Sequence, residues 1–168
     1  RTELHGYLDT TTSYVSIVEL GMYEMTGKLH EQLGAIHKPG SDAFESAFDA
    51  EMETQRQRVM SRLFIEIPRA RYVCFYPMNK RRGESVNWYS EPFERRAGMM
   101  REHGMIGRHY SGKVTQVISG SIGYDDWEWG VDLFAQDPLV FKKLIYEMRF
   151  DEASAKFAEF GPFYTGLQ

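Results

Sequence analysis

The order of the regular segments after Pro68 limits the fold of this chain more than any other feature of its sequence. Runs of apolar and β-branched residues predict strands, and segments opened by Ser, Asp and Pro predict helices. The predicted strands are 70–78, 113–123, 127–135 and 157–166, and the predicted helices run from Ser90 to about Gly104 and from Asp137 to about Arg149. The resulting order, βαββαβ, predicts a ferredoxin-like α+β domain, in which helices cover one face of an antiparallel sheet.

The residues before this domain follow a different pattern. The run YVSIVEL, residues 14–20, alternates in the manner of a half-buried strand. A connector follows from residue 21 to residue 67, with a short helix expected around 28–36. Ser41 then precedes a longer segment with acids at its start and arginines near its end, which predicts a capped helix.

Composition excludes several classes of function. The chain has 168 residues and a formal net charge of −4, which argues against a general nucleic-acid-binding domain, because such domains carry a basic excess. Its single cysteine, Cys74, cannot form an internal disulfide and favours a reducing compartment such as the cytoplasm. No apolar run is long enough to span a bilayer, and no P-loop, dinucleotide fingerprint, nucleophile elbow, CxxC pair or HExxH motif is present.

One histidine and one glutamine are candidates for a ligand site. His103 falls on the same face of its predicted helix as Phe93, Ala97 and Met100. An ordinary core or capping histidine and a metal ligand both fit this position. Gln116 shares a face of its predicted strand with aliphatic residues. Because a buried amide costs free energy unless it has a partner, Gln116 either bonds the backbone or is directed at a ligand.

A cluster of cationic and aromatic side chains follows the strand predicted at 70–78. Alternation along that strand places Tyr76 at the lip of a pocket, and Pro77 is expected to end the ladder. A thioether, three cations and an indole ring come next, contributed by Met78, Lys80, Arg81, Arg82 and Trp88. These residues form either a solvated loop with a core tryptophan or a site for an anionic, planar guest, because Lys and Arg recognise carboxylates.

Several blocks of the sequence are similar to those of a known family. The blocks are YPMNKRR, NWY, EHGMIGR, GKVTQVISGS, DDWEWGVDLF and FKKLIYEMRFDEASA. They resemble the Firmicutes-type coproheme decarboxylases of the chlorite dismutase superfamily, almost continuously over residues 57–168. The resemblance implies a ferredoxin-like fold of the dimeric α/β-barrel type, assembled as homopentamers. It also implies that residues 1–20 end a first ferredoxin-like half, that 21–67 form a connector, and that 68–168 form the haem-binding half.

The resemblance further implies an activity and a cofactor. The reaction would be the hydrogen-peroxide-dependent oxidative decarboxylation of coproheme, iron coproporphyrin III, at propionates 2 and 4. Its product would be haem b, so the enzyme would act in haem biosynthesis. Coproheme would be both substrate and cofactor, in a cytoplasmic enzyme without a membrane span or a nucleic-acid partner.

Roles for individual residues follow from the same resemblance. His103 would be the proximal iron ligand, and Gln116 would lie over the iron on the distal side. Tyr76 would be the redox-active tyrosine that takes hydrogen from propionate 2, and Lys80 would assist at propionate 4. Further contacts with the macrocycle edge and the propionates would come from Met78, Trp88, Arg62, Arg149 and Ser154.

Three alternatives remain open at this point. A chlorite dismutase or peroxidase is disfavoured, because true chlorite dismutases place an arginine over the iron where this chain has Gln116. A haem- or porphyrin-binding module without turnover would need His103 but not Tyr76 or Lys80. A ferredoxin-like association domain would need none of the three as functional residues.

Overall fold

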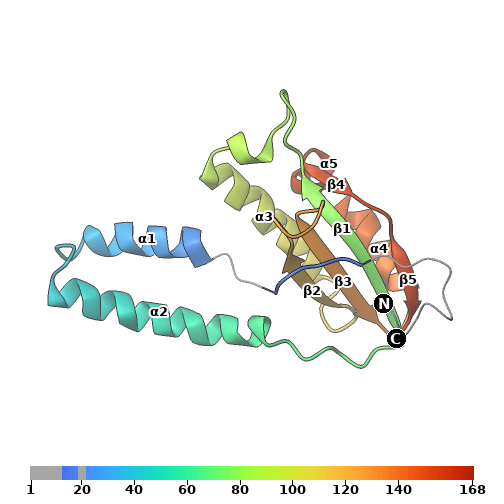
Figure 1. The fold of residues 1–168 in the computed structure, drawn as a ribbon, viewed down its shortest axis with the longest axis horizontal. Coiled ribbons are helices and arrows are strands. Elements are labelled where there is room, and N and C mark those ends of the chain that lie inside the picture. Colours follow the sequence, from blue (N-terminus) through green and yellow to red (C-terminus); the bar gives the residue numbers. More distant parts are fainter. Residues whose placement is uncertain (1–12, 19–21) are drawn as a thin grey trace. The chain divides into compact units, whose positions relative to one another are not determined.

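A computed structural model describes residues 13–18 and 22–168, without the side chains of 22–27, 58–59 and 61–63. The chain forms two compact units (Figure 1). The larger unit joins the described residues up to Ile17 with Pro68–Gln168, and the smaller unit is Val18–Ile67.

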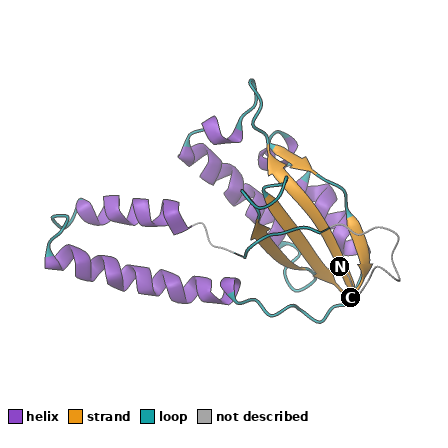
Figure 2. Ribbon diagram, viewed as in Figure 1, coloured by secondary structure: helices purple, strands orange, loops and turns teal. Residues whose placement is uncertain are grey.

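The larger unit is built on an antiparallel sheet (Figure 2). Its strands are β1 (Tyr72–Lys80), β2 (Thr115–Gly120), β3 (Trp129–Ala135), β4 (Ala158–Phe160) and β5 (Tyr164–Leu167). The order across the sheet is β2-β3-β1-β4, and β5 pairs with the first part of β1. This is the strand order of a ferredoxin-like βαββαβ domain, so the predicted α+β class and topology are confirmed.

Helices cover one face of this sheet. They are α3 (Phe93–Arg108), which follows the short 3-10 helix η2 (Trp88–Ser90), and α4 (Leu139–Met148), which a short helix α5 (Glu152–Ala155) follows. Alternate residues of the central strands point at them and form a core of buried side chains, which includes Cys74, Tyr76, Val131 and Leu133 from the sheet and Phe141, Leu144 and Met148 from α4. Each such side chain stabilises the fold by about 1.5–3 kcal/mol through removal from water.

Three predicted details of the larger unit are wrong. Pro77 does not end β1, because the residues after it pair with β4, and the amide of Gly161 donates to the Pro77 carbonyl at 2.9 Å. The helix predicted to end near Gly104 continues to Arg108, since Gly104 keeps a negative φ and breaks no helical bond. The last strand, predicted as a single segment over 157–166, is split into β4 and β5.

The segment before the connector contacts the end of the hairpin. Ile17 forms an isolated bridge with Gly120, with N···O distances of 2.7 and 2.8 Å, so the described part of the strand predicted at 14–20 makes one bridge only. Residues 19 and 20 of that prediction lie outside the described residues. The Tyr14 ring packs against Phe75, on the face of the sheet opposite the helices. Gly130 permits this, because a Cβ there would lie 2.6 Å from the Tyr14 ring.

The smaller unit is a helical hairpin of α1 (Met22–Gly34) and α2 (Asp42–Leu63). The Ser41 hydroxyl accepts the amide of Phe44 at 3.3 Å and caps α2, as predicted. Phe44 is buried and contacts the ring of His30 at a centroid distance of 4.8 Å. Among the described residues of both units, no helix is long and apolar enough to cross a membrane.

Candidate functional site

The second half of α3 carries His103 on the side of the helix that faces α5. Its Nδ1 lies 3.0 Å from Oδ2 of Asp151, which is buried, while the His103 side chain keeps 27% of its surface exposed. A carboxylate oxygen accepts hydrogen bonds, so Nδ1 is the donor in this contact, and in the neutral tautomer that makes it the lone pair is on Nε2. Within the described part of the chain, no residue makes a hydrogen bond to Nε2, since both hydrogen-bond contacts of the ring involve Nδ1. A histidine held through one nitrogen by a carboxylate, with the other nitrogen available, has the arrangement of a metal ligand.

Asp151 also organises the start of α5. Its carboxylate accepts the amide of Ser154 at 2.9 Å and the Ser154 hydroxyl at 3.1 Å, which caps the helix. The same hydroxyl is 3.3 Å from His103 Nδ1. The hydroxyl expected to hold a propionate is therefore engaged inside this cluster. Sequence reasoning missed Asp151; its position before a short helix indicates a cap, but no spacing rule connects it to a histidine 48 residues earlier.

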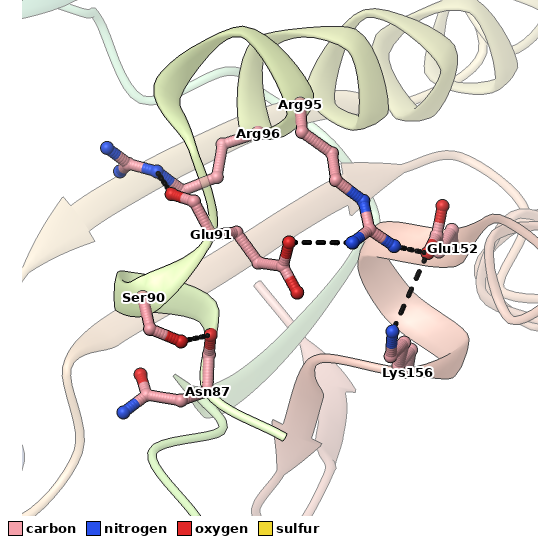
Figure 3. A network of polar contacts seen from close by, with 7 residues as sticks. All are labelled: Asn87, Ser90, Glu91, Arg95, Arg96, Glu152 and Lys156. Carbon is pink, nitrogen blue, oxygen red and sulfur yellow. Dashed lines mark hydrogen bonds and ion pairs between the residues drawn. The ribbon is translucent and has the colours of Figure 1, made fainter. Parts of the chain in front are cut away.

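A network of polar contacts joins the start of α3 to α5 (Figure 3). Arg95 donates to Glu91 and to Glu152, at 2.7 Å in each case, and Lys156 is 3.9 Å from Glu152. Arg95, Glu152 and Lys156 are exposed and Glu91 is half-buried, so each pair alone stabilises the fold little. Because α3 carries His103 and α5 begins at the Asp151 cap, this network joins the two elements that bring the His103 imidazole and the Asp151 carboxylate together.

Tyr76 lies in the middle of β1, opposite Val131 of β3. Its side chain is buried rather than at the lip of a pocket, with the ring stacked on Phe163 at a centroid distance of 4.5 Å. Burial, with a smaller contribution from the charge of Cys74, raises the pKa of Tyr76. The phenol therefore stays protonated at neutral pH and keeps its O–H hydrogen.

Lys80 and Trp88 form the second part of the site. Lys80 is buried, its ammonium donates to the Ala153 carbonyl at 2.8 Å, and it lies 4.4 Å from the centroid of the Trp88 ring. Burial lowers the pKa of Lys80 to about 8, although Asp151 and Glu128 act in the opposite direction. Trp88 packs edge-on against Phe157 and is a core residue.

Arg81 and Arg82, by contrast, are exposed. The three-cation stretch is thus divided between one buried ammonium and two solvated guanidinium groups.

Gln116 differs from the prediction of a buried amide, because its side chain is exposed on β2, the edge strand. It pairs with Leu133, which belongs to the core under the helices, so Gln116 lies on the helix side of the sheet. Tyr76 lies on the same side, two strands away. The two residues are roughly 12 Å apart, since strands are spaced by about 4.8 Å and residues by about 3.3 Å.

The remaining predicted contacts are more dispersed. Met78 is half-buried beside the core of the larger unit. Arg149 is exposed at the end of α4, with its guanidinium carbon 5.4 Å from the centroid of the Phe160 ring. Arg62 lies in α2, and its side chain is outside the described residues.

The donor set limits what kind of metal site this can be. Within the part of the chain that the structure describes, no three His, Cys, Asp or Glu side chains gather around a common point. A metal bound by His103 alone would need its other ligands from its own cofactor, as the nitrogens of a porphyrin provide. A single carboxylate-held imidazole fits an iron porphyrin and does not fit a structural zinc or calcium site.

Fold and site together define a ferredoxin-like α+β domain whose helix layer holds a histidine, His103, in the arrangement of a metal ligand. The chain belongs to the chlorite dismutase family, whose model matches residues 1–168.

Two curated relatives are coproheme decarboxylases. That of Staphylococcus saprophyticus is 48% identical over 166 residues, and that of Staphylococcus carnosus is 50% identical over 166 residues. Each match covers 99% of this chain and 58% of the relative. The chain thus spans a little over half the length of these curated relatives.

Solved structures agree with the fold. A heme-binding protein from Thermus thermophilus is 59% identical, with a TM-score of 0.64, and the match covers 66% of this chain and 44% of that one. A chlorite dismutase variant from Candidatus Nitrospira defluvii has a TM-score of 0.54 at 20% identity, with coverage of 66% and 46%. The second likeness concerns the fold alone.

Proposed function

We propose that this chain supplies the porphyrin-binding half of an enzyme that decarboxylates coproheme with hydrogen peroxide to give haem b. The observation that carries the proposal is the His103 imidazole, which Asp151 holds through Nδ1. The Nε2 lone pair is then available to iron. The two staphylococcal relatives, named as coproheme decarboxylases, support the same activity.

The iron porphyrin, when bound, supplies the two-electron chemistry with peroxide. For each propionate the balance is –CH₂CH₂COO⁻ + H₂O₂ + H⁺ → –CH=CH₂ + CO₂ + 2 H₂O. One C–H bond and one C–C bond of the propionate break and a C=C bond forms, while the peroxide O–O bond is reduced to water. Propionates 2 and 4 would react in turn, with a three-propionate intermediate between the two steps.

The chain's own residues would hold the propionates and accept hydrogen from them. Tyr76 remains a neutral phenol because burial raises its pKa, so it has an O–H hydrogen to lose and to regain from a propionate CH₂ group. Lys80 presents an ammonium group of reduced pKa, which would pair with the second propionate and could return a proton. For that contact it must exchange its bond to the Ala153 carbonyl for one to the carboxylate.

The other site residues would contact the macrocycle. Gln116, exposed on the helix side of the edge strand, would face the iron from the sheet. An amide carries no charge to bind an oxyanion, so decarboxylation is preferred to chlorite dismutation. The edge and the propionates would be bound by Met78, Arg149 and Arg62, whereas Trp88, predicted for the same edge, is a buried core residue and would act through Lys80. Ser154 would act through Asp151 rather than on a propionate.

A second candidate is a haem- or porphyrin-binding module without turnover. It is favoured by the solved relative from Thermus thermophilus, which is described as a heme-binding protein.

In both cases we propose a homopentameric assembly in the cytoplasm, on the basis of the resemblance to the coproheme decarboxylases. Light scattering of the purified chain would measure its oligomeric state.

The experiment that tests the proposal is a titration with ferric coproporphyrin III. We expect a shift of the Soret band on binding, followed, on addition of hydrogen peroxide, by the successive loss of two carboxyl groups in the mass spectrum. A Soret shift without a mass change would favour the binding module. No Soret shift would contradict both.

The Tyr76→Phe variant tests the assignment of the tyrosine. It should bind coproheme as the wild type does and produce no haem b, because the phenyl ring has no O–H hydrogen to exchange. Tyr72→Phe, on the same face of the same strand, is the matched control and should turn over normally. Normal turnover by the Tyr76 variant would contradict the assignment.

A further inference from the structure

Among the described residues, three charged side chains are buried: Lys80, Glu128 and Asp151. The proposed function uses Lys80 on a propionate and Asp151 on the iron ligand. It leaves Glu128 without a role. A carboxylate is costly to bury unless it is paired and hydrogen-bonded, so its partners indicate what it does.

The side-chain partners of Glu128 come from the end of β1 and the residues that follow it, while its backbone carbonyl accepts the amide of Ser121 at 2.8 Å. Oε2 accepts the backbone N–H of Lys80 at 2.8 Å, and Oε1 is 3.5 Å from Nε of Arg82. Burial raises the pKa of Tyr89, and the Glu128 carboxylate raises it further. The backbone N–H of Glu128 donates to Oδ1 of Asn79 at 2.7 Å, so the Glu128 backbone is also held by a residue of β1.

The loop from Arg81 to Trp88 is closed by its own backbone bonds. The amide of Trp88 donates to the Arg81 carbonyl at 2.8 Å, and Arg82 bridges Asn87. Glu128 therefore contacts this loop through Arg82, and its charge also acts on Tyr89, which directly follows the loop. Lys80 directly precedes this loop, and Trp88, whose ring the Lys80 ammonium contacts, is its last residue.

We propose that Glu128 is a positioning residue for Lys80, which it anchors through the backbone and keeps charged beside Trp88. The anchoring is independent of any ligand, and the consequence for turnover rests on the proposed function. An exposed glutamate would do little to keep Lys80 charged, because solvent screens its charge.

The charges that face Lys80 come from two directions. Asp151, at the cap of α5, and Glu128, before β3, both favour the ammonium form, and burial opposes it. The charged or titratable groups that act on Glu128 in turn are Arg82 and Tyr89. Removal of the Glu128 charge should therefore lower the pKa of Lys80, by about one unit for a neighbouring opposite charge.

The test is the Glu128→Gln variant of the whole chain. The amide oxygen can still accept the Lys80 N–H, so the variant removes the charge and keeps the anchor. Glu159→Gln is the matched control, because Glu159 pairs with Arg81 at 3.9 Å on the surface. The first readout is the NMR titration of ¹³C-labelled lysine side chains, with the Lys80 signal assigned as the one missing from Lys80→Met.

We expect the Lys80 midpoint to fall by about one pH unit in Glu128→Gln and to stay unchanged in Glu159→Gln. If the second decarboxylation needs the ammonium form, its rate should fall about fivefold at pH 8 and stay near wild type at pH 6. A purely structural defect would slow that step equally at both pH values. The first decarboxylation should keep its wild-type rate.

An unchanged Lys80 midpoint in Glu128→Gln would overturn the proposal. If the wild type binds coproheme without turnover, the proposed function fails, and the NMR midpoint still decides the role of Glu128. If Glu128→Gln does not fold, Glu128→Asp serves instead. It keeps the charge, so its Lys80 midpoint should match the wild type, and a fall of about one unit would overturn the proposal.

Discussion

At the scale of single residues, the site depends on a few buried polar groups that each make more than one contact. Asp151 caps α5 through Ser154 and holds the imidazole of His103. Lys80 contacts a carbonyl, an indole ring and, through its backbone, Glu128. A substitution at either residue therefore removes several interactions at once. Comparison with a variant that removes only one of these interactions separates the effect on stability from the effect on binding.

Asp151→Ala should destabilise the larger unit by about 2–3 kcal/mol, since it removes a helix cap and leaves buried donors without an acceptor. Urea unfolding followed by circular dichroism measures the change. Ser41→Ala removes a cap only, and should cost about 1 kcal/mol. Equal costs for the two variants would contradict the assignment of a second role to Asp151. In the coproheme titration, the Asp151 variant should also bind more weakly than Ser41→Ala.

The pH dependence of stability should report the buried lysine. The unfolded lysine titrates near 10.5 and the folded one near 8, so below pH 8 the folded state carries the full cost of a buried charge. As pH rises from about 8 to 10.5 the unfolded chain binds more protons, and this cost is progressively relieved. Between pH 7.5 and 9.5 the wild type should gain about 2 kcal/mol relative to Lys80→Met.

Urea unfolding of the wild type and of Lys80→Met at the two pH values measures this gain. Because both proteins contain the same tyrosines, the comparison removes their contribution. A constant difference between the two proteins from pH 7.5 to 9.5 would show that Lys80 titrates normally.

At the scale of elements, the sheet is interrupted where two segments cross closely. β4 and β5 both pair with β1, and the break between them falls at Gly161, whose Cβ would lie 2.7 Å from Cγ of Pro77 and 2.9 Å from the ring of Trp127. Such a position accepts only glycine without movement of its neighbours. Phe160 and Phe163, on either side of the break in sequence, both contact the Tyr76 ring.

Gly161→Ala should destabilise the larger unit by about 1–3 kcal/mol, because the added methyl group overlaps a proline and an indole ring. Gly98→Ala is the matched control. Gly98 lies in α3 with no heavy atom within 4 Å of its Cβ position, so alanine there should stabilise by about 0.5–1 kcal/mol. Thermal unfolding of both variants measures the two opposite changes. A neutral Gly161→Ala would mean that the neighbours move apart easily.

Most of the element order was predictable because it depends on local pattern and on turn and cap residues. The contacts that define the site were not, because they join residues distant in sequence. Asp151 meets His103 across 48 residues, and Glu128 meets Lys80 across 48. Exposure was also misjudged: alternation places Gln116 on the helix side, but only the strand order makes β2 an edge and leaves the amide exposed.

At the scale of the whole molecule, the chain has two units with separate sets of buried side chains. Leu133 is fully buried in the core of the larger unit. Phe44 is buried in the smaller unit, where it contacts His30 and Phe48. Units with their own buried cores can open separately, because loss of one core leaves the contacts of the other intact.

Two core substitutions should therefore act on different sets of amides. Phe44→Ala should raise hydrogen exchange in α1 and α2 and leave β1–β5 as protected as in the wild type, since it creates a cavity only in the smaller unit. Leu133→Ala, the matched core variant, should raise exchange in the sheet and in α3 and α4. Exchange monitored by mass spectrometry at peptide resolution measures both. Equal deprotection of both units by Phe44→Ala would show that the two unfold as one.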